Sequence, residues 1–313
     1  MTLKFDPEVA DVLAQMGGTD AFQPPRDDVE GRRAFWEPIL AASSTAQPFP
    51  EDVRMSDSYA TTDDAARIQM RWYTKEGATP GPAVVYFHGG GYFFGHIDHF
   101  DGTLARYVSA SGVPMLSVEY RRAPEHPFPT PIEDGYAALR WLHEHAAELG
   151  VDPGRIGVMG DSAGGGLAAA VAILTRERGG PKIARQILIM PMLDDRTGAP
   201  DDHVAPFIYN YGDLVTGWRA FLGDAVGGSD VPATAAPARL EDATGLPPAY
   251  IEVGQLDLFR DEDTAYATKL SHAGVPVEFH LHPGVPHEFD SLAFTSDVAR
   301  RAIADRVRVL KSI

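Results

Sequence analysis

Apolar and polar residues follow two different periods along this chain, and the change of period marks its elements. Two early segments alternate polar and apolar side chains, as half-buried strands do, and they span residues 53–59 and 67–73. Later strands are expected at short segments rich in apolar residues, which are typical of a buried parallel sheet. These segments are residues 82–87, 114–119, 156–159, 186–190, 249–253 and 277–281.

Helices are expected between these strands, where apolar residues recur at helical spacing. They span residues 99–111, 132–149, 163–174, 262–273 and 292–310. Strands that alternate with helices form βαβ units, so the pattern predicts the α/β class with a mostly parallel central sheet flanked by helices.

Two segments depart from this alternation. Residues 1–50 are amphipathic in short helical pieces that prolines interrupt, and residues 193–246 form an insertion with helical pieces and an aromatic side. We interpret residues 1–50 as an N-terminal cap segment and residues 193–246 as the second half of a helical cap. Residues 51–313 then form the main α/β domain, which carries this insertion.

Composition narrows the class of protein. The formal net charge is -17, which disfavours nucleic acid and anionic membranes as partners. The chain has no cysteine, so disulfides, thiolate nucleophiles and cysteine metal sites are excluded. Residues 1–13 lack the apolar run of a signal peptide, and no stretch is long and apolar enough for a membrane span. We expect a soluble, cytoplasmic protein.

The candidate nucleophile is Ser162, at the centre of the sequence Gly-Asp-Ser-Ala-Gly over residues 160–164. An apolar strand precedes this sequence and a helix of small residues follows it. A serine on such a sharp strand-to-helix turn requires small neighbours, because the backbone must fold back on itself. The turn also places Ser162 at a helix N-terminus, where free N–H groups favour negative charge.

A base and a carboxylate are expected beyond the last two strands. His287 follows the final strand, and Asp257 follows the strand before it. Asp261, Glu262 and Asp263 are the alternative carboxylates, and Asp257 is preferred because it lies nearest its strand end. His280 and His282 compete with His287, but their alternation is that of surface strand positions.

The oxyanion donors are expected in two places. One is the N–H of Ala163, directly after the nucleophile, and the other is the glycine run after His88, where no side chain obstructs the backbone. Gly90 and Gly91 are the first choice and Gly89 is the reserve. His88 and Asp161 are interpreted as structural residues that hold this region by hydrogen bonds.

Four separated motifs in the chain resemble those of the bacterial hormone-sensitive-lipase-like esterases. They are HGGGY at 88–92, YRRAPEHPFPTPIED at 120–134, GDSAGG at 160–165 and DLFRDE at 257–262. The resemblance implies an α/β-hydrolase fold with a helical cap and carboxylesterase activity on short acyl esters. It further implies a catalytic triad of Ser162, His287 and Asp257, no cofactor, and a possible homodimer through the last strand.

One residue departs from the resemblance. Members of this family typically have His-Gly-Phe at the catalytic histidine, whereas this chain has Glu288 between His287 and Phe289. We expect the Glu288 side chain to turn away from His287 and to fix the loop. Glu288→Gly should then lower stability and leave the acidic limb of the pH profile in place.

The substrate pocket is expected to include Tyr92, Phe93, Phe207 and Tyr211, because the cap and the glycine loop carry bulky aromatic residues. No metal is expected, since the histidines at 96–99 and 143–145 lack a zinc spacing. The glycine run also lacks the dinucleotide-binding spacing. Two alternatives to an esterase stay open: an amide or carbamate hydrolase, and a non-catalytic small-molecule receptor.

Overall fold

One mixed sheet runs through the part of the chain that the computed structural model describes, namely residues 3–15, 24–46, 48–77, 80–198 and 209–313. The strands within these residues are β1 (Val53–Thr61), β2 (Arg67–Lys75), β3 (Gly81–Phe87), β4 (Met115–Val118), β5 (Val151–Asp161), β6 (Arg185–Ile189), β7 (Ala249–Gly254) and β8 (Val277–His282). They are hydrogen-bonded in the spatial order β1-β2-β4-β3-β5-β6-β7-β8.

Among the described strands, β2 alone runs opposite to the others. The first two pairs, β1 with β2 and β2 with β4, are antiparallel, and every pair from β4 onward to β8 is parallel. The α/β class and the mostly parallel sheet that the pattern predicts are therefore confirmed. In a parallel sheet the carboxyl ends of the strands meet at one edge, so the loops after β3, β5, β7 and β8 lie together.

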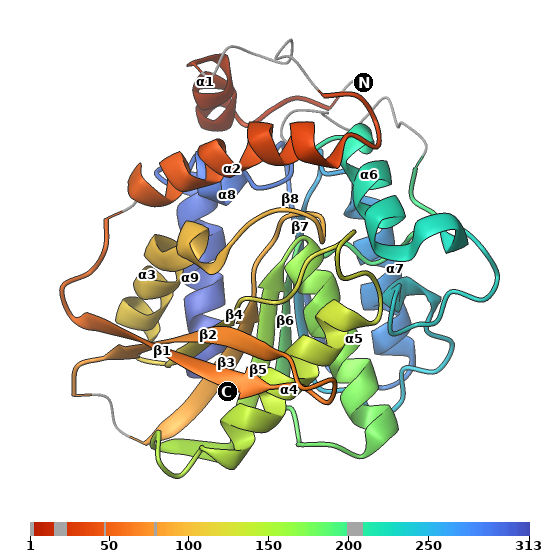
Figure 1. The fold of residues 1–313 in the computed structure, drawn as a ribbon. Helices are drawn as coiled ribbons and strands as arrows, with labels where there is room; N and C mark the ends of the chain where they lie inside the picture. The colour runs from red at the N-terminus through yellow and green to blue at the C-terminus, as the bar shows by residue number, and fades with distance from the viewer. Residues whose placement is uncertain (1–2, 16–23, 47, 78–79, 199–208) are drawn as a thin grey trace.

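Helices cover both faces of the sheet. The helices within the described residues are α1 (Pro7–Gln15), α2 (Val29–Ala46), α3 (Asp101–Ser111), α4 (Thr130–Glu144), α5 (Ala163–Arg178), α6 (Tyr211–Leu222), α7 (Arg260–His272), α8 (Phe289–Leu292) and α9 (Asp297–Lys311). In Figure 1, α3 and α9 lie on one side of the sheet, and α4, α5 and α7 on the other. This layering buries β3, β5, β6 and β7, whose residues are mostly inaccessible to solvent.

Several predicted helix boundaries differ from those in the structure. The closing helix does not begin at Leu292 but at Asp297, because the Ser296 side chain accepts a hydrogen bond from the N–H of Ala299 and starts a new helix there. The helix predicted to end at Leu149 ends at Glu144. The helix expected from His99 begins at Asp101, after a 3₁₀ turn at Ile97–Phe100.

Two segments far apart in sequence meet above the carboxyl ends of the strands. Helix α2 precedes the sheet, α6 belongs to the insertion, and both lie at the same end of the molecule in Figure 1. A buried ion pair joins Arg32 of α2 to Asp213 of α6, and the Trp36 indole N–H donates to the same carboxylate over 3.0 Å. None of the helices in the described residues combines the length and the apolarity that a membrane crossing requires.

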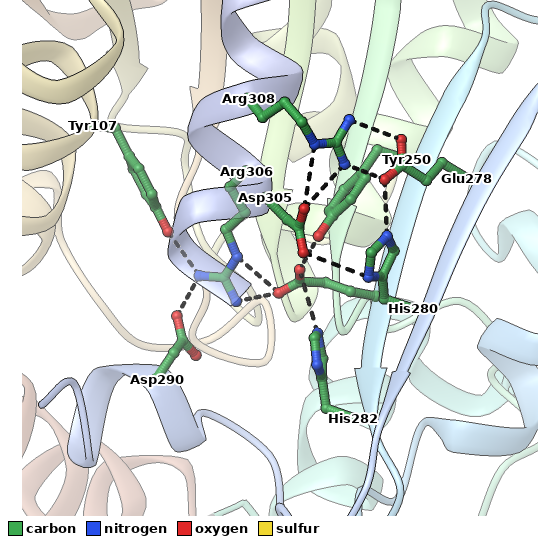
Figure 2. Close-up of polar contacts among 10 residues, drawn as sticks. Tyr107, Tyr250, Glu278, His280, His282, Asp290, Asp305, Arg306 and Arg308 are labelled. Atoms are coloured by element: carbon green, nitrogen blue, oxygen red, sulfur yellow. Dashed lines mark hydrogen bonds and ion pairs between the residues drawn. The ribbon is translucent and has the colours of Figure 1, made fainter. Parts of the chain in front are cut away.

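A buried charge cluster ties helix α9 to the sheet. Arg306 is 1% exposed, and its Nε donates to Glu252 of β7 over 2.7 Å. The same guanidinium donates to the Tyr107 hydroxyl over 2.6 Å and pairs with Asp290 of α8 (Figure 2). Because Asp290 follows closely after His287, this cluster also anchors the loop that carries His287.

Arg306→Met should destabilise the protein by about 3–5 kcal/mol, because it leaves the carboxylates of Glu252 and Asp290 buried without their cation. Arg308 on the same helix is the matched control, since its side chain is 53% exposed and pairs with Glu278 at the surface (Figure 2). Arg308→Met should cost less than about 1 kcal/mol. Urea unfolding of the two variants measures both values, and equal losses would contradict the role given to Arg306.

Candidate active site

Ser162 occupies the sharp turn between β5 and α5. Its backbone has φ 54° and ψ -122°, a conformation that residues with a side chain rarely adopt. The turn is held by the neighbouring strand, because the Ser162 N–H donates to the carbonyl of Ile189 over 2.9 Å. Such strain at a residue that is otherwise unremarkable is typical of functional positions.

The glycines on either side of Ser162 are required by close backbone approach. A Cβ atom on Gly160 would lie 2.2 Å from the carbonyl oxygen of Gly164. A Cβ atom on Gly164 would lie 2.0 Å from the carbonyl oxygen of Phe87, at the end of β3. Any side chain at either position would therefore collide with main-chain atoms, and the turn closes only with glycine.

The structure brings Ser162, His287 and Asp257 into one hydrogen-bonded chain. The Ser162 Oγ lies 2.9 Å from His287 Nε2, and His287 Nδ1 lies 2.8 Å from Asp257 Oδ2. The other carboxylate oxygen of Asp257 accepts the N–H of Phe259 over 2.9 Å, which fixes its orientation. All three side chains are at least 97% buried and come from the ends of β5, β7 and β8.

The competing carboxylates lie elsewhere. The Asp261 side chain is 81% exposed and pairs with Arg260. Glu262 accepts the N–H of Leu193 over 2.6 Å, and Asp263 is buried without a hydrogen-bond partner among the described residues. None of the three contacts the imidazole of His287.

The competing histidines are engaged with other carboxylates. His280 Nε2 lies 2.8 Å from Glu278, and His282 Nε2 lies 3.6 Å from Glu252 (Figure 2). Both side chains therefore belong to the charge cluster around α9 rather than to the environment of Ser162.

The loop after β3 lies beside Ser162, since a Cβ atom on Gly89 would lie 3.4 Å from the Cβ of Ser162. Gly90 and Gly91 have φ 123° and φ 56°, and a Cβ atom on Gly90 would lie 2.0 Å from the carbonyl oxygen of Phe94. Within the described residues, no acceptor pairs with the N–H of Gly90, Gly91 or Ala163. The N–H of Gly89, by contrast, donates to Asp161 over 3.1 Å, so it is already used.

His88 and Asp161 hold this loop. The His88 Nδ1–H donates to the Gly89 carbonyl over 2.7 Å, and the ring stacks on Tyr120 at 4.4 Å between centroids. Burial lowers the pKa of His88 to about 4, so the ring is neutral. Asp161 accepts from the Gly89 N–H and from the Tyr86 hydroxyl, while burial and then the charge of Glu288 raise its pKa.

A small cavity of about 60 Å³ opens onto Ser162. Its walls are largely apolar and come from α2, the loop after β3, Tyr209 just before α6, and α8. The side chains that define this cavity are Trp36, Ile39, Leu40, Phe94, Phe100, Tyr209 and Leu292, together with Ser162, His287 and Glu288.

The residues that line this cavity differ from the predicted pocket residues. Tyr92, Phe93 and Tyr211 do not line it, because the Tyr92 ring stacks on Phe221 at 4.3 Å inside the core and Phe93 packs beside Phe94. Phe207 lies outside the described residues.

Sequence reasoning placed the aromatic wall at the wrong residues of the right segments. Phe94 lines the cavity in place of Phe93, and Tyr209 lines it in place of Tyr211. The one available signal was the apolar stripe of α2, in which Trp36, Ile39 and Leu40 share a face.

Glu288 does not turn away from His287, contrary to the expectation from the sequence. Its Oε1 lies 3.9 Å from His287 Nε2, and its Oε2 accepts the Ser291 hydroxyl over 2.9 Å. Its backbone has φ 55°, a left-handed conformation that favours the glycine typical of the family. Glu288→Gly would remove a hydrogen bond and relieve strain together, so the loss of stability expected from the sequence does not follow.

The carboxylates change the basicity of the imidazole. Burial by itself would lower the pKa of His287, but Asp257 and then Glu288 raise it to about 9. The neutral base in the free enzyme therefore forms at higher pH than for an ordinary histidine.

Glu288→Gln should move the acidic limb of the kcat/KM profile downward by about 1 pH unit, because the neutral amide no longer favours the imidazolium. His287 acts as a base only when its ring is neutral. The value of kcat/KM therefore falls as the pH drops below the pKa of His287, and a lower pKa moves this limb to lower pH. Stopped-flow or pH-stat rates between pH 5 and 10 measure the limb. A limb that stays in place would show that the Glu288 charge does not reach His287.

No group of three or more metal-ligating side chains gathers in the described part of the chain. The histidines at 96–99 and 143–145 have local partners instead. His96 Nδ1 lies 3.1 Å from Glu119, and His145 Nδ1 lies 2.8 Å from the carbonyl of Trp141.

Comparisons with known proteins agree with this arrangement. The family described as alpha/beta hydrolase fold matches residues 84–291. Carboxylesterase NlhH of Mycobacterium tuberculosis is 39% identical over 239 residues, which cover 74% of this chain and 73% of that protein. Ethyl acetate hydrolase of Pseudomonas putida is 33% identical over 266 residues, covering 83% and 82%. The structure of a bacterial heroin esterase superposes with a TM-score of 0.91 at 34% identity, covering 99% of this chain and 98% of that one.

Proposed function

This chain belongs to the alpha/beta hydrolase family of hormone-sensitive-lipase-like esterases, and on that premise we propose that it is a carboxylesterase with Ser162 as its nucleophile. His287 is the base, and Asp257 orients and stabilises it. The observation that carries the proposal is the continuous chain from Ser162 Oγ through His287 to Asp257, with both links below 3.0 Å. A serine hydroxyl needs such a base, because it is a weak nucleophile alone.

Acylation follows from this geometry. The Ser162 Oγ attacks the ester carbonyl while His287 Nε2 takes its proton, and Asp257 stabilises the imidazolium that forms. We assign the developing oxyanion to the N–H groups of Gly90, Gly91 and Ala163, which have no acceptor among the described residues and would stabilise it without reorganising. His287 then gives its proton to the alcohol oxygen, and the alcohol departs.

Deacylation repeats the same steps with water. His287 takes a proton from the water molecule that attacks the acyl-serine carbonyl, and it returns that proton to Ser162 as the acid leaves. The reaction thus consumes one water and yields one acid and one alcohol. Each proton moves through Nε2 of His287, so no step requires a metal or an organic cofactor.

Helices α2 and α6 support the two-part cap expected from residues 1–50 and 193–246. The buried pair of Arg32 and Asp213 joins the two helices, and Trp36 and Leu40 of α2 line the same cavity as Ser162. These side chains close the cavity above the nucleophile, and the acyl group of a substrate must fit beneath them.

Esters of short acids should be the better substrates. The cavity is small, at about 60 Å³, and bulky side chains of α2 form part of its wall, which suits a short acyl group. We expect kcat/KM for p-nitrophenyl esters to fall at least about tenfold from butanoate to octanoate. A specificity constant that rises steadily toward palmitate would contradict this cavity as the acyl site.

Leu40→Ala is the variant that connects this preference to the cap. It enlarges the wall of the cavity without touching the triad, so the rate ratio of octanoate to acetate should rise. Ala41→Gly, on the exposed side of the same helix, is the control and should leave the ratio unchanged.

The enzymatic activity is tested by p-nitrophenyl acetate hydrolysis with purified wild-type protein and Ser162→Ala. Turnover by the wild type that the variant lacks supports the esterase. The receptor alternative predicts binding without turnover, and the amide and carbamate alternatives predict faster cleavage of p-nitroacetanilide or a carbamate than of the acetate.

A homodimer through β8 is the proposed assembly. Among the residues that the structure describes, this strand pairs only with β7 and lies at the edge of the sheet, so its other side offers backbone groups to a second copy. Sedimentation at several concentrations tests the dimer. The cytoplasmic location stays a prediction from the sequence.

A further inference from the structure

Glu288 places a carboxylate oxygen in the cavity with no hydrogen-bond donor of its own. Its Oε2 accepts the Ser291 hydroxyl, whereas Oε1 pairs with nothing closer than His287 Nε2, at 3.9 Å, among the described residues. The other carboxylate of the cavity, Asp161, uses both oxygens for Tyr86 and Gly89. Glu288 is therefore the acidic side chain that can turn an oxygen toward a bound molecule.

The position of this oxygen points to the alcohol half of the substrate. His287 Nε2 gives its proton to the leaving alcohol, so the alcohol oxygen must come within about 3 Å of that nitrogen. Glu288 Oε1 lies 3.9 Å from the same nitrogen. The first carbons of the alcohol therefore pass beside Glu288, while the acyl group lies on the other side of the ester bond.

The rest of the wall favours a positive charge at this place. No lysine or arginine lines the cavity within the described ranges, and burial lowers the pKa of His99, which keeps its ring neutral. Phe94, Phe100 and Tyr209 contribute aromatic rings, whose faces attract cations. In this apolar surrounding a charged Glu288 is screened far less than at the surface, and the same burial raises the pKa of its carboxyl.

We propose that Glu288 is a specificity residue that selects esters of amino alcohols, in which a cationic nitrogen stands about two carbons from the ester oxygen. The inference rests on the proposed esterase function and names its substrate class. The φ of 55° gives a further reason, because the chain keeps a charged side chain where its backbone favours glycine.

Acetylcholine and 3,3-dimethylbutyl acetate test this directly, since they share their shape and acyl group and differ in the charge of one atom. We expect kcat/KM of wild-type protein to favour acetylcholine at least about tenfold, and Glu288→Gln to lower that ratio about tenfold. The ratio is the readout because both esters use His287 alike, so a change in its pKa cancels.

Glu144→Gln is the matched control, since this exposed residue at the end of α4 removes the same charge far from the cavity. In Glu144→Gln the ratio of kcat/KM for acetylcholine to kcat/KM for 3,3-dimethylbutyl acetate should equal that of the wild type. The preference should also persist in 1 M NaCl, where the Debye length falls to about 3 Å and attraction by the acidic surface is screened.

The possible results separate a failure of cation selection by Glu288 from a failure of the proposed esterase function. Ser162-dependent hydrolysis of both esters at similar rates, or a ratio that Glu288→Gln leaves unchanged, would overturn the selection of cations and leave the esterase intact. A preference that disappears in 1 M NaCl would assign it to the surface charge and overturn the role of Glu288. Hydrolysis of p-nitrophenyl acetate but of neither acetylcholine nor 3,3-dimethylbutyl acetate would likewise overturn the selection, whereas failure to hydrolyse p-nitrophenyl acetate would contradict the proposed function itself.

Discussion

Ser162→Ala should lower kcat for p-nitrophenyl acetate by about 10⁶-fold and leave the fold intact, as the loss of a triad serine does in the best-studied case. The hydroxyl is the atom that attacks, so no neighbouring group replaces it. Alanine fits the turn at least as well as serine, because its side chain is a methyl group and serine only adds a hydroxyl to the same carbon. The free energy of unfolding, measured by thermal denaturation, should therefore change by less than about 1 kcal/mol.

Ser43 provides the matched control for this prediction. It lines the same cavity from α2, and its hydroxyl donates to the carbonyl of Ser291 over 3.3 Å. Ser43→Ala removes one hydroxyl from the cavity but should lower kcat less than about tenfold. If a folded Ser162→Ala protein kept more than a few per cent of the activity, the nucleophile would lie elsewhere.

Asp257→Asn should lower kcat by about 10⁴-fold, the loss seen when a triad aspartate becomes an amide. The carboxylate accepts the His287 Nδ1–H over 2.8 Å and so leaves Nε2 free to take a proton. An amide in its place can donate instead, which favours the wrong tautomer. It also removes the charge that stabilises the imidazolium.

Asp261→Asn is the control, because it removes the same charge as Asp257→Asn from a residue that does not contact His287. The two aspartates follow the same strand, but the Asp261 side chain is 81% exposed and pairs with Arg260. We expect nearly normal kinetics for this variant. The assignment fails if Asp261→Asn is crippled while Asp257→Asn is nearly normal.

The strands and the triad could be predicted because both follow from local sequence. Apolar segments marked the strands, and residues that follow a parallel strand meet at one edge of the sheet whatever the loops do. Ser162, Asp257 and His287 each stand at such an end, so their meeting followed from topology.

The cavity wall could not be predicted in the same way, because it depends on loop dihedrals. Gly90, Gly91 and Tyr92 all have positive φ, and this path turns Tyr92 into the core while Phe94 reaches the cavity. Glu288 shows the same limit: adjacent side chains usually diverge, but its φ of 55° brings the carboxylate back toward His287. The capped start of α9 likewise depends on which serine folds back on its own helix.

The most direct test of the central claim is the stoichiometric reaction with a p-nitrophenyl alkylphosphonate, which forms a stable phosphonyl ester on an activated serine. We predict release of one equivalent of p-nitrophenolate per chain, full loss of esterase activity, and one phosphonyl group on the peptide that contains Ser162. Asp257→Asn should react far more slowly and Ser162→Ala not at all. Complete inactivation with the phosphonyl group on another residue, or unmodified protein that still hydrolyses esters, would contradict the triad.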